Sequence, residues 1–254
     1  MIITTLADIQ EHLPRDRWQH LLRALGAPCA DGRPLAVERI LEINGLDDAL
    51  CALQAVRGYD SAIRLFACHC ARYCLDIFER RYHPDEKRPR QAIETAERHA
   101  HGQATDKELT AVRFAAGYAS DECHPYSFFG IPLPPPPTPF LPLLWLARLF
   151  PNPENDADLA MYAASNATWA TCIANAADAA RNATKNAMDA VKNAERVLRN
   201  DLSGEFMGEL MGVKNADERA ARDDFTREFF RLCRLEGAYG EVSGRERQSG
   251  ETPS

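Results

Sequence analysis

The chain has 254 residues, of which 45% are hydrophobic and 26% are charged. This apolar fraction excludes a disordered chain and is enough for one ample core or two small ones. No run of 18 apolar residues occurs, which excludes a transmembrane helix, and the N-terminal segment carries acids rather than the basic start of a signal peptide. The net charge of −7 disfavours nucleic acid and anionic membranes as partners and favours a basic partner.

The first 120 residues predict a series of short helices, because apolar residues recur at steps of three and four between Pro and Gly stops. No segment shows the alternation of a strand. The expected helices cover residues 5–13, 15–25, 34–43, 47–58, one starting at Asp60, 89–100 and 105–119. The last begins with a capping box, Thr105 and Glu108, whose side chains satisfy each other's free backbone donors.

The helix that begins at Asp60 carries a broad apolar stripe. Residues spaced by three and four share one side of a helix, so this side is expected in the core. Its members are Ile63, Phe66, Ala67, Cys70, Cys74, Ile77 and Phe78.

Residues 121–156 break the helical pattern. Ten of the sixteen prolines lie between Pro125 and Pro153, which is incompatible with one regular helix. The segment predicts an irregular, proline-rich insert that either packs over the helices as a strap or exposes its rings for recognition. In the second case the partner-binding residues are Tyr126, Phe128, Phe129, Phe140 and Trp145.

The region after the insert is rich in alanine, with fifteen in residues 157–194, and has neither Pro nor Gly from 155 to 202. Alanine favours helix, so we expect one long helix or two stacked ones. The expected packing face comprises Leu159, Tyr162, Asn166, Trp169, Ile173, Ala176, Ala180 and Ala183. An amphipathic helix follows at 216–235, with Phe225, Phe229, Leu232 and Cys233 facing inward.

These patterns predict an all-α protein, a helical bundle or helical array with the irregular insert. The expected divisions are an N-terminal multi-helix region at 1–120, the insert at 121–156, the alanine-rich and C-terminal helices of the same domain at 157–240, and a disordered tail at 241–254.

The segment Cys68-His69-Cys70 and Cys74 is the clearest candidate metal site. Cys70 and Cys74 lie four residues apart on one helical face, and Cys123-His124 could complete a zinc site. The alternative is that these cysteines fill the apolar stripe, which we favour because the second pair is adjacent in sequence. We therefore expect no metal and no cofactor, and a cytoplasmic protein whose cysteines act as small hydrophobes.

Catalytic motifs are absent from the sequence: it has no nucleophile elbow, phosphate loop or dinucleotide fingerprint. The acidic pairs Asp47-Asp48 and Asp223-Asp224 are better explained by first helical turns or solvated faces than by catalysis. His99 and His101 point to different faces of a helix end, which favours capping or solvent exposure over a shared metal. The prediction is a protein that is not an enzyme.

Residues 40–116 resemble the immunity-protein family of bacterial polymorphic toxin systems, which also occurs in phages and mobile elements. The resemblance lies in residues 44–50 (NGLDDAL), 64–67 (RLFA), 87–93 (KRPRQAI) and the turn at 102–105 (GQAT). The family is all-α and is not known for an active site, so the resemblance implies no catalytic residues.

The resemblance implies a non-catalytic inhibitor that binds and neutralises a protein toxin or effector. One alternative is a phage-encoded inhibitor of a bacterial defence system, with the insert as its contact surface. A zinc-binding helical protein or enzyme is another, and self-association of the helices into a homo-oligomer is a third.

Overall fold

The computed structural model describes the chain in several segments. The described residues are 1–81, 86–122, 127–128, 131–132, 153–200, 217–236 and 239. The helices are α1 (Leu6–Ile9), α2 (Arg15–Leu25), α3 (Val37–Asn44), α4 (Leu46–Ala52), the 3-10 turn η1 (Leu53–Ala55), α5 (Asp60–Arg81), α6 (Arg88–Ala100), α7 (Asp106–Glu122), α9 (Pro153–Ala170), α10 (Ala176–Asn200) and α12 (Glu218–Arg234). The short strands are β1 (Ile3–Thr5), β2 (Pro34–Ala36), β3 (Ser127–Phe128) and β4 (Ile131–Pro132).

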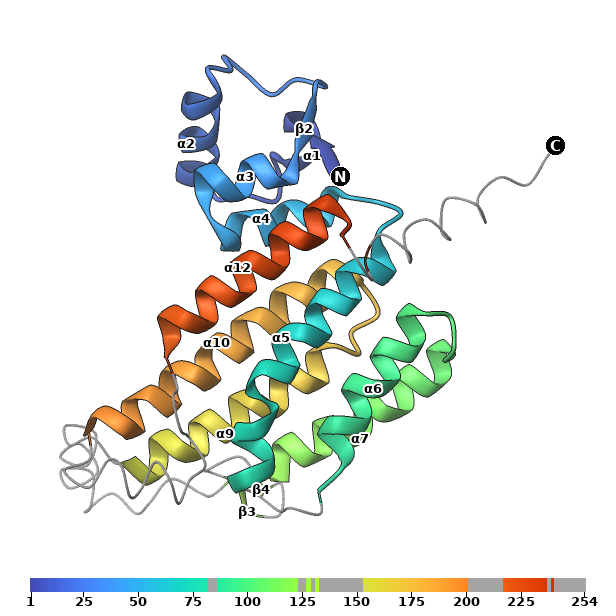
Figure 1. Ribbon diagram of the computed structural model, residues 1–254, viewed down its shortest axis with the longest axis vertical. Helices are drawn as coiled ribbons and strands as arrows, with labels where there is room; N and C mark the ends of the chain where they lie inside the picture. Colours follow the sequence, from blue (N-terminus) through green and yellow to red (C-terminus); the bar gives the residue numbers. More distant parts are fainter. Residues whose placement is uncertain are drawn as a thin grey trace.

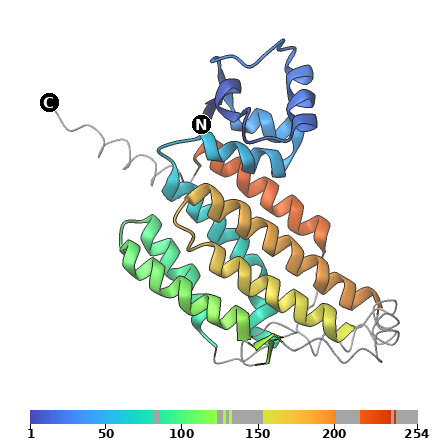
Figure 2. The same ribbon diagram turned by 180° about the vertical axis from the view of Figure 1, so that it is seen from behind.

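The predicted all-α architecture is confirmed, and the helices form a bundle built around α5 (Figures 1 and 2). Helix α5 packs against the α9–α10 pair, with α6 on one side of it and α12 on the other. Helices α6 and α7 form a hairpin at the edge of the bundle, and residues 1–59 form a lobe at one end (Figure 1). None of the helices in the described residues has the length and apolar content that crossing a membrane requires.

The predicted stripe of α5 is the centre of the core. Phe66, Cys70, Cys74 and Phe78 are fully buried. The Phe66 ring meets the Phe229 ring of α12 edge-on, with centroids 5.4 Å apart. The predicted inward residues of α12 are buried as well, so both amphipathic patterns are confirmed.

The alanine-rich region forms two helices that pack closely, because their buried faces are largely alanine. The face predicted for α9 is wrong: Leu159, Tyr162 and Trp169 are only half-buried, while Ala160, Ala164 and Ala167 are buried. The close approach of α10 favours small side chains on the buried face of α9, while the larger Trp169 and Ile173 are partly buried against the core. On α10 the predicted alanines Ala176, Ala180 and Ala183 are buried as expected.

Arg64 of α5 holds the turn between α9 and α10. Its guanidinium donates hydrogen bonds to the carbonyl oxygens of Thr171 at 2.7 Å, Ile173 at 2.8 Å and Ala174 at 2.8 Å. Asn175 then caps α10 by accepting a hydrogen bond from the backbone N–H of Asp178. Helix α9 therefore ends without Pro or Gly, and a buried cation satisfies the carbonyls of the turn that follows it.

The first 36 residues differ from the sequence prediction, which expected helices and no strands. β1 pairs antiparallel with β2, with Ile3 opposite Ala36, and the helix predicted at 5–13 is reduced to α1. Strands of three residues are too short to show a period of two in the sequence. This lobe has a small core of its own, formed by Leu6, Ile9, Leu13, Trp18, Leu21, Ile40 and Ala52.

The helix predicted at 34–43 starts only at Val37, after β2, and the one predicted at 47–58 ends at Ala52 and continues as η1. Three other predicted boundaries hold closely. Asp60 starts α5, Pro89 lies in the first turn of α6, and Gly102 follows α6 with a φ of 70°. Thr105 and Glu108 form the predicted capping box, with hydrogen bonds in both directions. Most of the insert and the whole tail at 241–254 lie outside the described residues, so the domain divisions remain a prediction.

Candidate functional site

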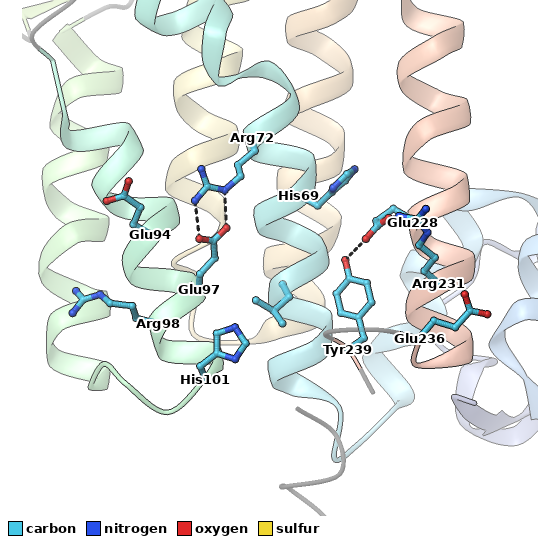
Figure 3. Close-up of a pocket in the computed structure, with 11 residues that line it drawn as sticks. His69, Arg72, Glu94, Glu97, Arg98, His101, Glu228, Arg231, Glu236 and Tyr239 are labelled. Atoms are coloured by element: carbon cyan, nitrogen blue, oxygen red, sulfur yellow. Dashed lines mark hydrogen bonds and ion pairs between the residues drawn. The ribbon is translucent and has the colours of Figure 1, made fainter. Parts of the chain in front are cut away.

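A groove of about 790 Å³ lies on the surface of α5, between α6 and α12 (Figure 3). Its floor contains Leu65, His69 and Arg72 of α5. Its volume falls in the range of ordinary binding pockets, and its walls carry both signs of charge. The remaining lining residues are Glu94, Glu97, Arg98 and His101 on the α6 side, and Glu228, Arg231, Glu236 and Tyr239 on the α12 side.

The α6 wall is fixed to the floor by a two-pronged ion pair. Nε and Nη2 of Arg72 each donate to a carboxylate oxygen of Glu97 at 2.7 Å. The hydrogen bonds to Glu97 raise the pKa of Arg72 above its usual value. Such planar pairing fixes orientation as well as charge, so the two helices hold a defined spacing at the groove.

The α12 wall is organised around Glu228. Its two oxygens accept hydrogen bonds from the Tyr239 hydroxyl and from Nη1 of Arg231, both at 2.9 Å. Tyr239 is buried, and burial together with the nearby Glu228 carboxylate raises the pKa of its hydroxyl. The phenol therefore stays protonated and acts as a hydrogen-bond donor.

His69 links the floor to α12. Its Nε2 lies 2.8 Å from Oδ2 of Asp224, and its ring meets Phe225 edge-on. Partial burial opposes ionisation of Asp224, but the hydrogen bonds from His69 and Arg227 outweigh it and lower the pKa of this carboxyl. The pair stabilises the contact between α5 and α12.

Some charged side chains of the groove are not paired with other groups of the protein. Within the described residues, Glu94, His101 and Glu236 have no hydrogen bond or ion pair from their side chains, and Arg98 donates to Thr95 Oγ1 alone. These groups remain available to a polar partner, whereas the pairs inside the groove are already satisfied.

The predicted cysteine cluster lies in the core. Cys70 accepts a hydrogen bond from Thr184 Oγ1, and burial raises the pKa of the Cys74 thiol to about 12. These thiols are protonated near neutral pH, as in apolar packing. The described residues contain no group of three or more potential metal ligands, and Cys123 and His124 lie outside them.

The two aspartates of the Asp47-Asp48 pair have different partners and do not form a shared site. Asp48 is buried and accepts a hydrogen bond from Asn44 Nδ2 at 2.7 Å, while Asp47 faces Arg222 across 3.8 Å. His99 Nε2 lies 2.8 Å from Asp106 Oδ1 and connects the end of α6 to the start of α7. His101 instead lines the groove, so the two histidines do have different environments.

The partner-binding residues predicted in the insert are not tested by the structure. The side chains of Tyr126, Phe128, Phe129, Phe140 and Trp145 lie outside the described residues. The sequence did not reveal the groove because its floor and its two walls come from three separate helices; Arg72 on the floor and Glu97 on the α6 wall, for example, are 25 residues apart. Only charged residues within the family-like segment could have suggested it.

Comparison with family models gives one match, over residues 60–124, to a model described as "Imm-5 like putative immunity protein". This segment is similar to that family. The match confirms the resemblance found in the sequence, although residues 44–50 lie before it. It covers α5, α6 and α7 and contributes seven of the eleven residues that line the groove. Comparison with curated proteins and with solved structures gives no match.

Proposed function

We propose that the protein is a non-enzymatic inhibitor that neutralises a protein toxin by binding it. The observation that carries this proposal is the immunity-protein match over residues 60–124. The groove supports it, because most of its lining residues come from the matched helices and several of them have unused charge. Function follows from such a site rather than from the helical fold, which serves many purposes.

The partner of this proposal is a basic protein. The chain has a net charge of −7, so a basic toxin would be attracted over a distance and would associate faster at low salt. Glu94 and Glu236, on opposite walls of the groove, are carboxylates that a basic surface could pair with. The proposal therefore places the contact at the groove.

The proposed compartment is the cytoplasm. The seven cysteines in the described part of the chain are free thiols, and most of them are buried. Such usage fits a reducing environment, where thiols serve as small apolar side chains.

Affinity capture tests the function directly. The tagged full chain is used to isolate binding proteins from its host and from neighbouring strains, and mass spectrometry identifies them. The captured protein is then expressed alone and together with this chain, and growth is measured. Restoration of growth by stoichiometric binding supports the proposal. A captured subunit of a defence system, or a captured protein without toxicity, contradicts it.

A further inference from the structure

The side chain of Tyr239 occupies the α12 side of the groove. It is 6% exposed, and its ring lies between α5 and α12 with the hydroxyl toward Glu228 (Figure 3). The hydroxyl donates to Oε1 of Glu228 at 2.9 Å, and Arg231 donates to Oε2 of the same carboxylate at 2.9 Å. The Glu228 side chain is 14% exposed and that of Arg231 is 65% exposed. A largely buried carboxylate is thus held by one neutral phenol and one exposed cation.

The turn that leads from α12 to Tyr239 is strained. Leu235, the first residue after α12, has a φ of 56° and a ψ of 47°, and it is the one non-glycine residue with a positive φ in the described part of the chain. A side chain makes this conformation unfavourable, which is why glycine is the usual residue at such a helix end. Release of Tyr239 would allow Leu235 to leave this conformation. The strain therefore lowers the free energy needed to move the ring out of the groove.

A cation is a better partner than a phenol for the Oε1 atom of Glu228. A guanidinium or ammonium group adds the attraction of opposite charges to its hydrogen bond, which a neutral hydroxyl does not. Four carboxylates and three arginines line the groove, so its charge also favours the entry of a cation. Arg231 already pairs with Oε2, and Oε1 is the position that a second cation would take.

We propose that Tyr239 is a built-in occupant of the groove, which an arginine or lysine of the binding partner replaces at Glu228. This exchange rests on the proposed function, which supplies the basic partner. In the free chain the phenol keeps the buried carboxylate hydrogen-bonded. In the complex the incoming cation pairs with Oε1, Arg231 keeps Oε2, and the displaced ring leaves its space between α5 and α12 to the incoming side chain. The affinity for the partner is then reduced by the fraction of the free chain in which Tyr239 occupies the groove.

Binding of a fluorescently labelled triarginine peptide to the full chain, measured by fluorescence anisotropy at low salt, tests this exchange. Tyr239→Phe keeps the ring but removes the hydroxyl, so it should raise the affinity for the peptide about threefold or more. Tyr239→Ala should raise it further, because the ring is removed as well. Glu228→Gln should lower the affinity about threefold or more, because it removes the charge that attracts the cation. Tyr73→Phe removes a hydroxyl from an exposed tyrosine of α5 that does not line the groove, and it is the matched control with no expected change.

The direction of the change distinguishes an occupant from a residue that only supports the wall of the groove. If Tyr239 only supports the wall, Tyr239→Phe and Tyr239→Ala should weaken peptide binding or leave it unchanged, and either result overturns the exchange. A peptide that binds neither the parent chain nor the two Tyr239 variants also overturns it, as does equal binding by all variants. Because no toxin is used, these results are separate from those of affinity capture. Failed capture would contradict the inhibitor function without changing the effect of Tyr239 on peptide binding.

Discussion

Arg64 is the residue on which the meeting of three helices depends. It is 3% exposed and donates to three backbone carbonyls, with no carboxylate hydrogen-bonded to it among the described residues. Burial lowers the pKa of its guanidinium, yet the group remains charged because an arginine pKa starts so high. It lies in the RLFA segment at 64–67, which carries part of the family resemblance. The role of Arg64 in this segment is structural.

Arg64→Met should destabilise the fold by about 3 kcal/mol, because it leaves the three carbonyls without their donor. Arg64→Lys should recover part of this loss, since an ammonium cannot span all three acceptors. Chemical denaturation measures both. Arg39→Met removes an exposed i,i+3 pair with Glu42 and should cost under about 0.5 kcal/mol. An equal cost for Arg64→Met and Arg39→Met would contradict this role.

The His69–Asp224 pair gives a pH-dependent contribution with a defined sign. The folded state lowers the pKa of Asp224, so this carboxylate stabilises the fold above its ordinary pKa of 3.8 and loses that contribution as the pH falls through the lowered value. Asp224→Asn should therefore be less stable than the parent chain at pH 5 to 7, and the difference should shrink toward pH 3. Urea unfolding at each pH measures it. A difference that grows on acidification contradicts the assignment.

The buried cysteines should be unreactive in the folded chain. Burial raises the pKa of Cys172 to about 11 and that of Cys233 to about 12, so almost no thiolate exists at pH 8. Iodoacetamide at pH 8 should label Cys29 rapidly, because this residue is exposed, and should label Cys172 and Cys233 only after unfolding. Peptide mass spectrometry reads each position. Rapid native labelling of Cys233 would show that α12 opens readily.

At the scale of elements, the sequence predicted helices well and their buried faces unevenly. Caps and stops such as Pro89, Gly102 and Thr105 act locally, so the sequence reveals them. The face of α9 depends on how closely α10 approaches, and the groove depends on pairs such as Arg72 with Glu97. Both are tertiary contacts between distant segments, which the pattern along one helix does not encode.

The alanine packing between α9 and α10 gives a direct test of that closeness. Ala183 is fully buried on α10, so Ala183→Leu should overpack the core around this helix and cost about 1 to 3 kcal/mol. Ala220→Leu is the control, because Ala220 is exposed on α12 and its replacement should be nearly neutral. Thermal and urea unfolding compare the two. Neutral behaviour of Ala183→Leu would mean that the two helices have room to spare.

At the scale of the whole molecule, the groove and the outer face of α7 are separate surfaces. None of the eleven residues that line the groove lies on α7.

The groove can be distinguished from the general effect of net charge by paired substitutions. Glu94→Lys with Glu236→Lys changes the net charge by +4 at the groove, and Glu11→Lys with Asp16→Lys makes the same change in the N-terminal lobe. Both pairs should slow association with a basic toxin at low salt, because steering depends on total charge. Only the groove pair should also speed dissociation, because it acts on contacts made in the complex. Surface plasmon resonance with the captured toxin at two salt concentrations measures both rates. Equal dissociation rates for the two variants would move the binding face away from the groove while leaving the inhibitor function intact.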